Sequence, residues 1–425
     1  MPARMPRSFL PLALLMTVAL AAPTATPGAA TGTAGEGTRR YTEHVSVNSA
    51  EMPANGQAAY ASVSANGRYV AFSSYADNLA TGDDRRNRDI FVRDRWAGTT
   101  SLVSEGLEGQ IRQDSSLADI SANGRIVAFN SEAAHLVRHD SNPGWDVFVR
   151  DLERGVTVLV SRASDETQAN RDAYLGPSIS PSGRYVAFLS FASNLVAGDD
   201  NGRPDVFVRD LRLGRTTRVS VPASGPEPDD KVAWPAVVAN DGRVAFATER
   251  QLVSRDKDAG NDVYVRIPSS GFRLVSQTSD GGQPAGISHQ PSISDNGRYI
   301  AFSSRAQLAP RDSNKISNVY VRDVHTGITT LVPGKRRLAY DPALSAGGRY
   351  VVAYKAHSFQ GAYLSMVDRL TGEISPVSVN NSGEIADGTS VDADVSKAGR
   401  FVVFTTDSYN MGPSPNPAVF LRRLR

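Results

Sequence analysis

One short segment, which ends in Gly-Arg followed by an apolar stretch, recurs seven times and constrains the fold more than any other feature. The copies read SVSANGRYVAF, DISANGRIVAF, SISPSGRYVAF, VVANDGRVAF, SISDNGRYIAF, ALSAGGRYVVAY and DVSKAGRFVVF. Their glycines lie 51 to 59 residues apart and are Gly67, Gly124, Gly183, Gly242, Gly297, Gly348 and Gly399. A period of this size indicates a chain built from repeated supersecondary units.

Each copy predicts a β-hairpin, because Asn-Gly or Ser-Gly supplies the positive φ that a two-residue β-turn requires. A polar loop follows, then a third strand of the type DVFVRD and a fourth of the type TTRVS. Four antiparallel strands per repeat make one propeller blade. The sequence therefore predicts an all-β, seven-bladed β-propeller with blade repeats that start near residues 61, 118, 177, 235, 291, 342 and 393.

The two ends of the repeat region complement each other. The last repeat stops after its third strand, AVFLRRL, and lacks a fourth. TEHVSV, from Thr42 to Val47, precedes the first repeat and matches TTRVSV from Thr216 to Val221. We expect this N-terminal strand to complete the blade that begins at Asp394, which leaves no sheet edge exposed. Six blades and an odd fragment are the alternative. Residues 40–425 form one predicted domain, with no separate catalytic domain.

The first residues have the pattern of a secretory signal peptide. Arg4 and Arg7 precede an apolar run from Phe9 to Ala21. We expect cleavage after Ala21, or near Ala25, and a disordered linker over residues 22–39. An uncleaved anchor is the alternative, but the run is shorter than the roughly 20 residues that span a bilayer. The chain has 0 cysteines, which excludes a lipoprotein anchor and disulfides. We expect a secreted or periplasmic monomer without a transmembrane anchor.

SPSGRYVAF and DVFVRD resemble the WD-repeat-like propeller units of the TolB type, and the resemblance covers roughly residues 40 to 425. It implies a β-propeller fold. TolB itself has six blades and an additional N-terminal α/β domain for which this chain has no room. A role in the envelope complex of that protein is therefore not carried over. The Gly-His to Trp-Asp pattern of true WD repeats is absent.

Propeller topology assigns the loops to two faces. The turns within the hairpins are tight, whereas the connections at 75–88 and 105–117 are long. Binding residues usually lie on variable loops over a rigid frame, so we expect function on the long-loop face. Arginines that recur in every blade, and the Arg-Asp pairs that end the third strands, are better explained as structural, because bidentate bonds to carboxylates can join neighbouring turns.

An acidic loop that precedes the third strand is the first candidate site. Position 1 of the loop is Asp, position 3 is Asn or Asp, and position 7 is Asp or Asn. Side-chain oxygens at this spacing suit the ligation of Ca²⁺. The four copies are Asp140, Asn142 and Asp146; Asp199, Asn201 and Asp205; Asp256, Asp258 and Asp262; and Asp312, Asn314 and Asn318, with a weaker copy at Asp83 and Asp89. Position 12 of an EF-hand would lie roughly 16 Å along a strand, so a complete EF-hand is excluded. Capping of the loop backbone is the alternative.

A set of ring side chains just before the innermost strands is the second candidate site. If these rings surround the channel mouth, they could hold a sugar or a peptide. Packing between blades is the alternative. The five residues are Tyr60, Tyr174, Trp234, His289 and Tyr340.

Enzyme signatures are sparse. The sequence has no Gly-x-Ser-x-Gly, no His-Glu-x-x-His and no phosphate-binding glycine loop. A formal net charge of +2 argues against a nucleic-acid partner. We expect a module that binds a protein, peptide or glycan partner, with no certain cofactor. A glycoside hydrolase or polysaccharide lyase with paired carboxylates at the channel mouth is the alternative. A scaffold in the cell envelope is a third.

Overall fold

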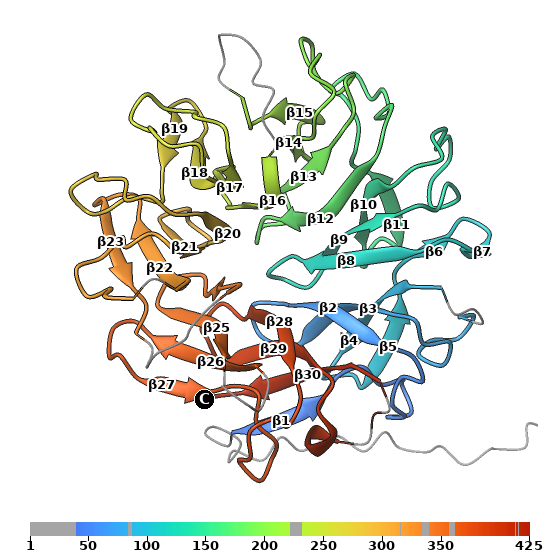
Figure 1. Ribbon diagram of the computed structural model, residues 1–425. Coiled ribbons are helices and arrows are strands. Elements are labelled where there is room, and N and C mark those ends of the chain that lie inside the picture. Colours follow the sequence, from blue (N-terminus) through green and yellow to red (C-terminus); the bar gives the residue numbers. More distant parts are fainter. Residues whose placement is uncertain are drawn as a thin grey trace, which may run out of the picture. The chain divides into compact units, whose positions relative to one another are not determined.

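The computed structural model describes residues 40–83, 87–221, 232–314, 316–333, 340–356, 362–412, 414 and 416–425. In these ranges, seven four-stranded antiparallel sheets surround a common centre (Figure 1). Side chains from all seven sheets line the central channel. The predicted seven-bladed propeller is confirmed. The predicted signal peptide and linker lie outside the described residues. Within those residues, no helix has the length and apolar character needed to cross a membrane.

The first four blades follow the chain, with the first strand innermost. Blade 1 contains β2 (Ala58–Val63), β3 (Tyr69–Ser74), β4 (Asp89–Asp94) and β5 (Thr99–Leu102). A small hairpin, β6 (Glu105–Gly106) and β7 (Gly109–Gln110), follows it. Blade 2 contains β8 (Ser115–Ile120), β9 (Ile126–Ser131), β10 (Asp146–Asp151) and β11 (Val156–Leu159). Blade 3 contains β12 (Ala173–Ile179), β13 (Tyr185–Ser190), β14 (Asp205–Asp210) and β15 (Arg215–Arg218). Blade 4 contains β16 (Val232–Val238), β17 (Val244–Thr248), β18 (Asp262–Ile267) and β19 (Gly271–Leu274).

The remaining three blades complete the ring. Blade 5 contains β20 (Ser288–Ile293), β21 (Tyr299–Ser304), β22 (Asn318–Asp323) and β23 (Ile328–Leu331). Blade 6 contains β24 (Ala343–Leu344), β25 (Tyr350–Ala356), β26 (Ala362–Asp368) and β27 (Ile374–Pro376). Blade 7 contains β28 (Ser390–Val395), β29 (Phe401–Thr406), β30 (Ala418–Arg423) and β1 (Tyr41–His44), with the 3₁₀ helix η2 (Tyr409–Met411) between β29 and β30.

The N-terminal strand closes the ring as expected. β1 pairs antiparallel with β30, with Tyr41 opposite Arg423 and His44 opposite Phe420. The regular strand ends at His44, before the expected Val47, because the backbone N–H groups of Val45 and Ser46 both donate to the carbonyl of Val419. The first and last strands of the propeller therefore share one sheet, and neither is left as a free edge.

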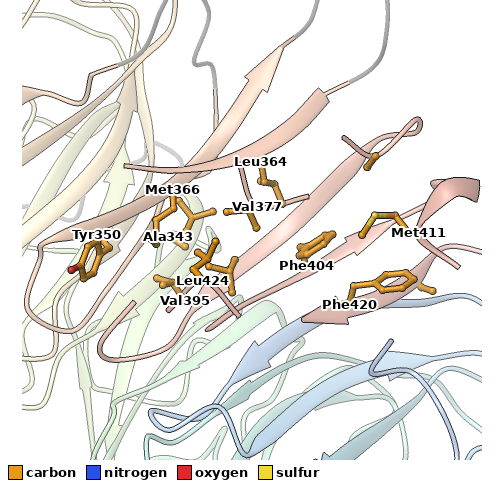
Figure 2. Packing of buried hydrophobic residues seen from close by; sticks show 14 residues of the cluster. Ala343, Tyr350, Leu364, Met366, Val377, Val395, Phe404, Met411, Phe420 and Leu424 are labelled. Atoms are coloured by element: carbon orange, nitrogen blue, oxygen red, sulfur yellow. The ribbon is translucent and has the colours of Figure 1, made fainter. Parts of the chain in front are cut away.

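Each interface between neighbouring blades has its own hydrophobic core. Seven clusters of buried residues are present among the described residues, and each draws on two adjacent blades. At the closing blade, Tyr350 and Leu364 of blade 6 pack with Phe404 and Phe420 of blade 7 (Figure 2). Within a blade, aromatic rings of the second and third strands also face each other. In blade 1 the ring centroids of Phe72 and Phe91 are 5.8 Å apart.

The hairpin turn is wider than the two-residue turn expected from Asn-Gly. In blade 1 the N–H of Gly67 donates to the carbonyl of Ser64 at 2.9 Å, and the N–H of Tyr69 donates to Ser64 Oγ at 2.9 Å. Gly67 has φ +74° and follows the turn instead of lying at its centre. This is the geometry of a β-turn followed by a left-handed residue. The two-residue prediction was wrong because the β-turn begins at Ser64 and ends at Gly67, which leaves the glycine after the two central residues.

The aromatic residue after Gly-Arg explains the glycine of the next blade. A Cβ added at Gly124 would lie 2.1 Å from the Tyr69 ring of blade 1, and one at Gly399 would lie 2.2 Å from the Tyr350 ring of blade 6. The intervening arginine binds within its own blade. Arg68 donates from Nε and Nη2 to Asp94, at 2.9 and 2.6 Å. These contacts agree with the structural interpretation of the repeated arginines.

Candidate functional sites on the long-loop face

The innermost strands share an irregularity near the mouth of the channel on the long-loop face. Register shifts interrupt six of the seven described pairings between first and second strands, and only that of β24 with β25 has none. Non-glycine residues there adopt left-handed φ, which is uncommon and typical of a bulge that redirects a side chain. They are Tyr60, Leu117, Leu175, Gln290 and Asp392, and Asp341, which lies just before β24, shares this conformation; their φ angles lie between 52° and 75°. We call these residues the mouth row.

The ring side chains singled out in the sequence lie along the same strands. Tyr60 belongs to the mouth row, whereas Tyr174, His289 and Tyr340 each precede a member of it. Only Tyr340 lies before its strand as expected; the other described rings lie within theirs, because the bulge lengthens the strand at its start. The side chain of Trp234 lies outside the described residues.

These rings are partly packed and partly exposed. Tyr174 stacks on Phe191 with centroids 5.4 Å apart, and His289 of blade 5 stacks on Tyr340 at 6.0 Å. Tyr60 and Tyr340 remain 39% and 43% exposed. Tyr340 therefore contacts both the ring of His289 and solvent. Ligand binding by these ring side chains stays a prediction.

Two mouth-row carboxylates, Asp341 and Asp392, form an acidic pair that the sequence did not identify. Burial and the charge of Asp341 raise the pKa of Asp392 to about 6, although a hydrogen bond from the backbone N–H of Tyr60 opposes this. Burial also raises the pKa of Asp341. The backbone N–H of Asp392 donates to the Tyr354 hydroxyl at 3.2 Å. The sequence contained one signal for this pair: Asp341 and Asp392 each lie two residues before the start of a repeat, at Ala343 and Asp394.

A hollow of about 500 Å³ opens on the same face, where residues of blades 1, 2 and 3 meet. Leu117 and Leu175 of the mouth row form part of its wall. Its volume is in the range of small-ligand sites. The other lining residues are Arg88, Ser116, Asn130, Trp145, Asp172 and Tyr174.

The acidic loop of blade 4 brings three carboxylates together. One oxygen from each of Asp256, Asp258 and Asp262 lies within 4.8 Å of the others. The Gln283 amide nitrogen donates to Asp256 and Asp262, both at 2.8 Å. Burial and the charges of Asp258 and Asp256 raise the pKa of Asp262 to about 7. Asp258 Oδ2 is buried and has no hydrogen-bond partner among the described residues. This loop has the oxygen donors that a Ca²⁺ ion requires.

The loop of blade 2 has the same construction with one carboxylate fewer. The Gln168 amide nitrogen donates to Asp140 at 2.6 Å and to Asp146 at 3.1 Å. Burial raises the pKa of Asp146 to about 7. Asn142 binds the carbonyl of Ala169 through its amide nitrogen, at 2.9 Å, and so caps the loop.

Protein groups already occupy the loops of blades 3 and 5. In blade 3, Arg218 Nη1 lies 3.2 Å from Asp199 and 3.5 Å from Asp205, and the fully buried Arg250 also pairs with Asp205. Asn201 accepts the N–H of Arg203 at 2.8 Å, as a loop cap does. A cation would meet two guanidinium groups at this loop.

In blade 5, the Asn318 amide nitrogen donates to Asp312, to Asn314 and to the carbonyl of Ile316, at 3.3, 2.9 and 3.1 Å. The Tyr320 hydroxyl donates to the other Asp312 oxygen. The amide hydrogens therefore point to where a cation would have to lie, so the spacing alone does not make a metal site.

Comparisons with known proteins support the fold. No family model matches the chain. A TolB homologue from Chlorobium chlorochromatii is 28% identical over 134 residues, which are 32% of this chain and 24% of that protein. Over this segment the repeats of the chain are similar to those of a TolB homologue. The alignment spans about a quarter of the relative's length, so the whole relative's activity does not follow.

Solved structures similar to this propeller share its architecture at low sequence identity. An oligogalacturonate lyase in complex with manganese has a TM-score of 0.59 and 12% identity, over 92% of this chain and 94% of that one. The propeller domain of a trilobed protease from Pyrococcus furiosus, described as having an open velcro topology, has a TM-score of 0.53 and 11% identity over 86% and 95%. These similarities show the fold alone.

Proposed function

We propose that this TolB-type propeller is a secreted or periplasmic binding module that holds a glycan or peptide at the channel mouth of its long-loop face. The carrying observation is the mouth row, where six non-glycine residues in left-handed conformation present polar, acidic and apolar side chains at equivalent positions of neighbouring blades. Strained backbone of this kind persists where the surrounding structure holds it, and it is concentrated at ligand sites.

The exposed rings beside the mouth row support a ligand with an apolar face. Tyr60 and Tyr340 combine a large ring with a polar tip and are each about two-fifths exposed. Such residues supply contact area at a small cost in conformational entropy. The rest of the frame is closely packed, with a core at each blade interface, so the site would be largely formed before the ligand arrives.

A panel of glycans and peptides from the producing organism's envelope and surroundings tests the proposal by immobilised-ligand binding. For a ligand that the wild-type protein binds, the double variant Y60A/Y340A should bind at least about tenfold more weakly, because each lost ring removes more than about 1 kcal/mol of contact. Leu370→Ala, at an exposed turn elsewhere, is the control. Unchanged affinity in the double variant would contradict the proposal.

Catalysis by the acidic pair is the second candidate function. Asp392 has a pKa near 6, raised by burial and Asp341, and two carboxyl groups with displaced pKa values are what acid–base chemistry on a glycan requires. Release of reducing ends or of unsaturated products from acidic and neutral glycans would reveal turnover. Activity that Asp392→Asn abolishes would establish an enzyme, whereas turnover that this variant retains would exclude the acidic pair.

The loop of blade 4 is the proposed site for a structural Ca²⁺ ion. Asp256, Asp258 and Asp262 would supply carboxylate oxygens, and the Gln283 amide would have to turn, because its NH₂ group cannot ligate a cation. Calorimetric titration of the chelator-treated protein with Ca²⁺ tests this. No heat at millimolar Ca²⁺ would refute it.

A further inference from the structure

Arg88 places a guanidinium group in the hollow between blades 1, 2 and 3, and its contacts among the described residues are with neutral groups. Its Nη1 donates to Ser116 Oγ at 2.9 Å and its Nη2 to the Tyr75 hydroxyl at 2.5 Å. The guanidinium carbon lies 4.7 Å from the Tyr75 ring centroid. No ion pair joins Arg88 to a carboxylate within the described part of the chain. Two of five donors are thus used by neutral oxygens, and a guanidinium fork suits a carboxylate.

The conformation of Arg88 is fixed before a ligand binds. Arg88 lies immediately before β4, and its backbone N–H donates to Asp114 Oδ1 at 3.0 Å. Its side chain is half-buried. The contacts with Tyr75 and Ser116 come from blades 1 and 2 respectively. The arginines of the Gly-Arg motif, such as Arg68 with Asp94, pair with carboxylates of their own blade. Arg88 differs from these in that its guanidinium contacts only neutral oxygens among the described residues.

Trp145 supplies a flat apolar surface in the same hollow. Its indole is half-buried and contacts no other ring and no cation among the described residues, whereas the Tyr174 ring is covered by Phe191. The backbone N–H of Trp145 donates to Asp172 Oδ1 at 3.1 Å, which holds the loop against the start of blade 3. An unpaired indole in a half-open site is suited to the C–H face of a pyranose ring.

The backbone of the hollow has little capacity left for a peptide. The Ala173 N–H donates to the Trp145 carbonyl at 2.7 Å, and the Ala173 carbonyl accepts from Asn130 at 2.7 Å. The N–H of Gly176 donates to the Asn130 side chain at 3.0 Å. Peptides are commonly held through backbone pairing, and these groups are already bonded. Side-chain recognition of a sugar meets no such obstacle.

We propose that this hollow binds a uronic acid residue of an acidic glycan. The sugar carboxylate takes the free donors of Arg88, the apolar face of the ring lies on Trp145, and Asp172 accepts from a hydroxyl. The proposal rests on the proposed function and narrows its ligand class, because it assigns the glycan to one hollow beside the mouth row.

Calorimetry with one matched pair of probes tests it: a galacturonate hexamer and the same hexamer with methyl-esterified carboxyl groups. The wild-type protein should bind the acid at least about tenfold more tightly than the ester, since a charge-assisted bond is lost. Arg88→Gln should remove that preference. Arg88→Lys should retain part of it, because the charge remains while the fork is lost. Trp145→Ala should weaken both probes about tenfold. Arg112→Gln, at an exposed arginine outside the hollow, is the control.

Each outcome bears on one proposal or both. Equal wild-type affinity for acid and ester, or full affinity in Arg88→Gln and Trp145→Ala, overturns the hollow as a uronate site. Binding of a peptide or neutral glycan in place of the hexamer overturns the hollow while the proposed function stands. Absence of binding to the hexamers and to the whole glycan and peptide panel overturns both. Far-UV circular dichroism and thermal melting of each variant exclude loss of the fold, and the ester comparison needs no variant.

Discussion

Blades 3 and 4 carry the same acidic loop and use it differently. Both loops turn directly into the third strand of their blade. In blade 3, Arg218 and the fully buried Arg250 neutralise the carboxylates. In blade 4, Gln283 contacts two carboxylates, and a third from Asp258 joins them. The repeat thus fixes where the acidic groups lie, and residues that differ from blade to blade determine which groups contact them.

The largest effect should come from Arg250. Replacing it with Met leaves Asp205 buried with only one guanidinium nearby, and we expect the free energy of unfolding to fall by about 3 kcal/mol, as for other broken buried pairs. Urea denaturation measures this. The double variant R250M/D205N should regain part of the loss, because the unpaired charge is then gone. Arg212→Met, at an exposed turn, is the control and should change little. A loss in R250M no greater than in that control would show that blade 3 does not depend on its arginines.

The second-largest effect should be the stabilisation of the protein by Ca²⁺, to which blade 4 should contribute and blade 3 should not. At a Ca²⁺ concentration of about 100 times Kd, binding adds about 2.7 kcal/mol to the stability. We expect the melting temperature of the wild-type protein to rise by about 5 °C. Asp258→Asn should abolish most of this rise, whereas Asp199→Asn in blade 3 should leave it intact. An equal rise in both variants would place the ion elsewhere.

The pH dependence of stability follows from Asp262. Its folded-state pKa of about 7 lies above the ordinary value of 3.8, chiefly because it is buried. The folded protein therefore holds the proton more tightly than the unfolded chain. The resulting stability is fully present below pH 3.8 and is lost as the pH rises to about 7. Asp262→Asn should flatten this window by about 2 kcal/mol in calcium-free buffer. Urea denaturation at pH 4 and pH 7.5 measures it; an unchanged slope would contradict the assignment.

The smallest effect should come from blade 5. Asn318→Asp replaces an amide NH₂ group, whose two hydrogens are directed at three oxygens, with a carboxylate next to Asp312. We expect a loss of about 1 kcal/mol without Ca²⁺ and recovery of part of it at millimolar Ca²⁺. Chemical denaturation without and with Ca²⁺ measures the loss of stability and its recovery. No response to Ca²⁺ would show that the third carboxylate, which blade 4 has and this variant lacks, is required.

The sequence by itself determined the number of blades, the order of strands and the closure of the ring. These properties are periodic, and a spacing of 51 to 59 residues with a strand missing at one end and added at the other leaves one arrangement. Local chemistry also fixed the Gly-Arg hairpins, although their turn begins at Ser64 and its equivalents and so has the glycine at its end.

Only the tertiary structure decided what the candidate sites contain. Gln283 and Arg250 reach the acidic loops from segments that sequence spacing does not connect to them, and Arg88, Trp145 and Tyr174 meet in one hollow from three different blades. The bulge at Asp392 adds a residue within a strand, and the repeated motif that follows it does not reveal this residue. Repeats determine the frame because it is periodic. The sites arise where blades differ, and those differences act through space.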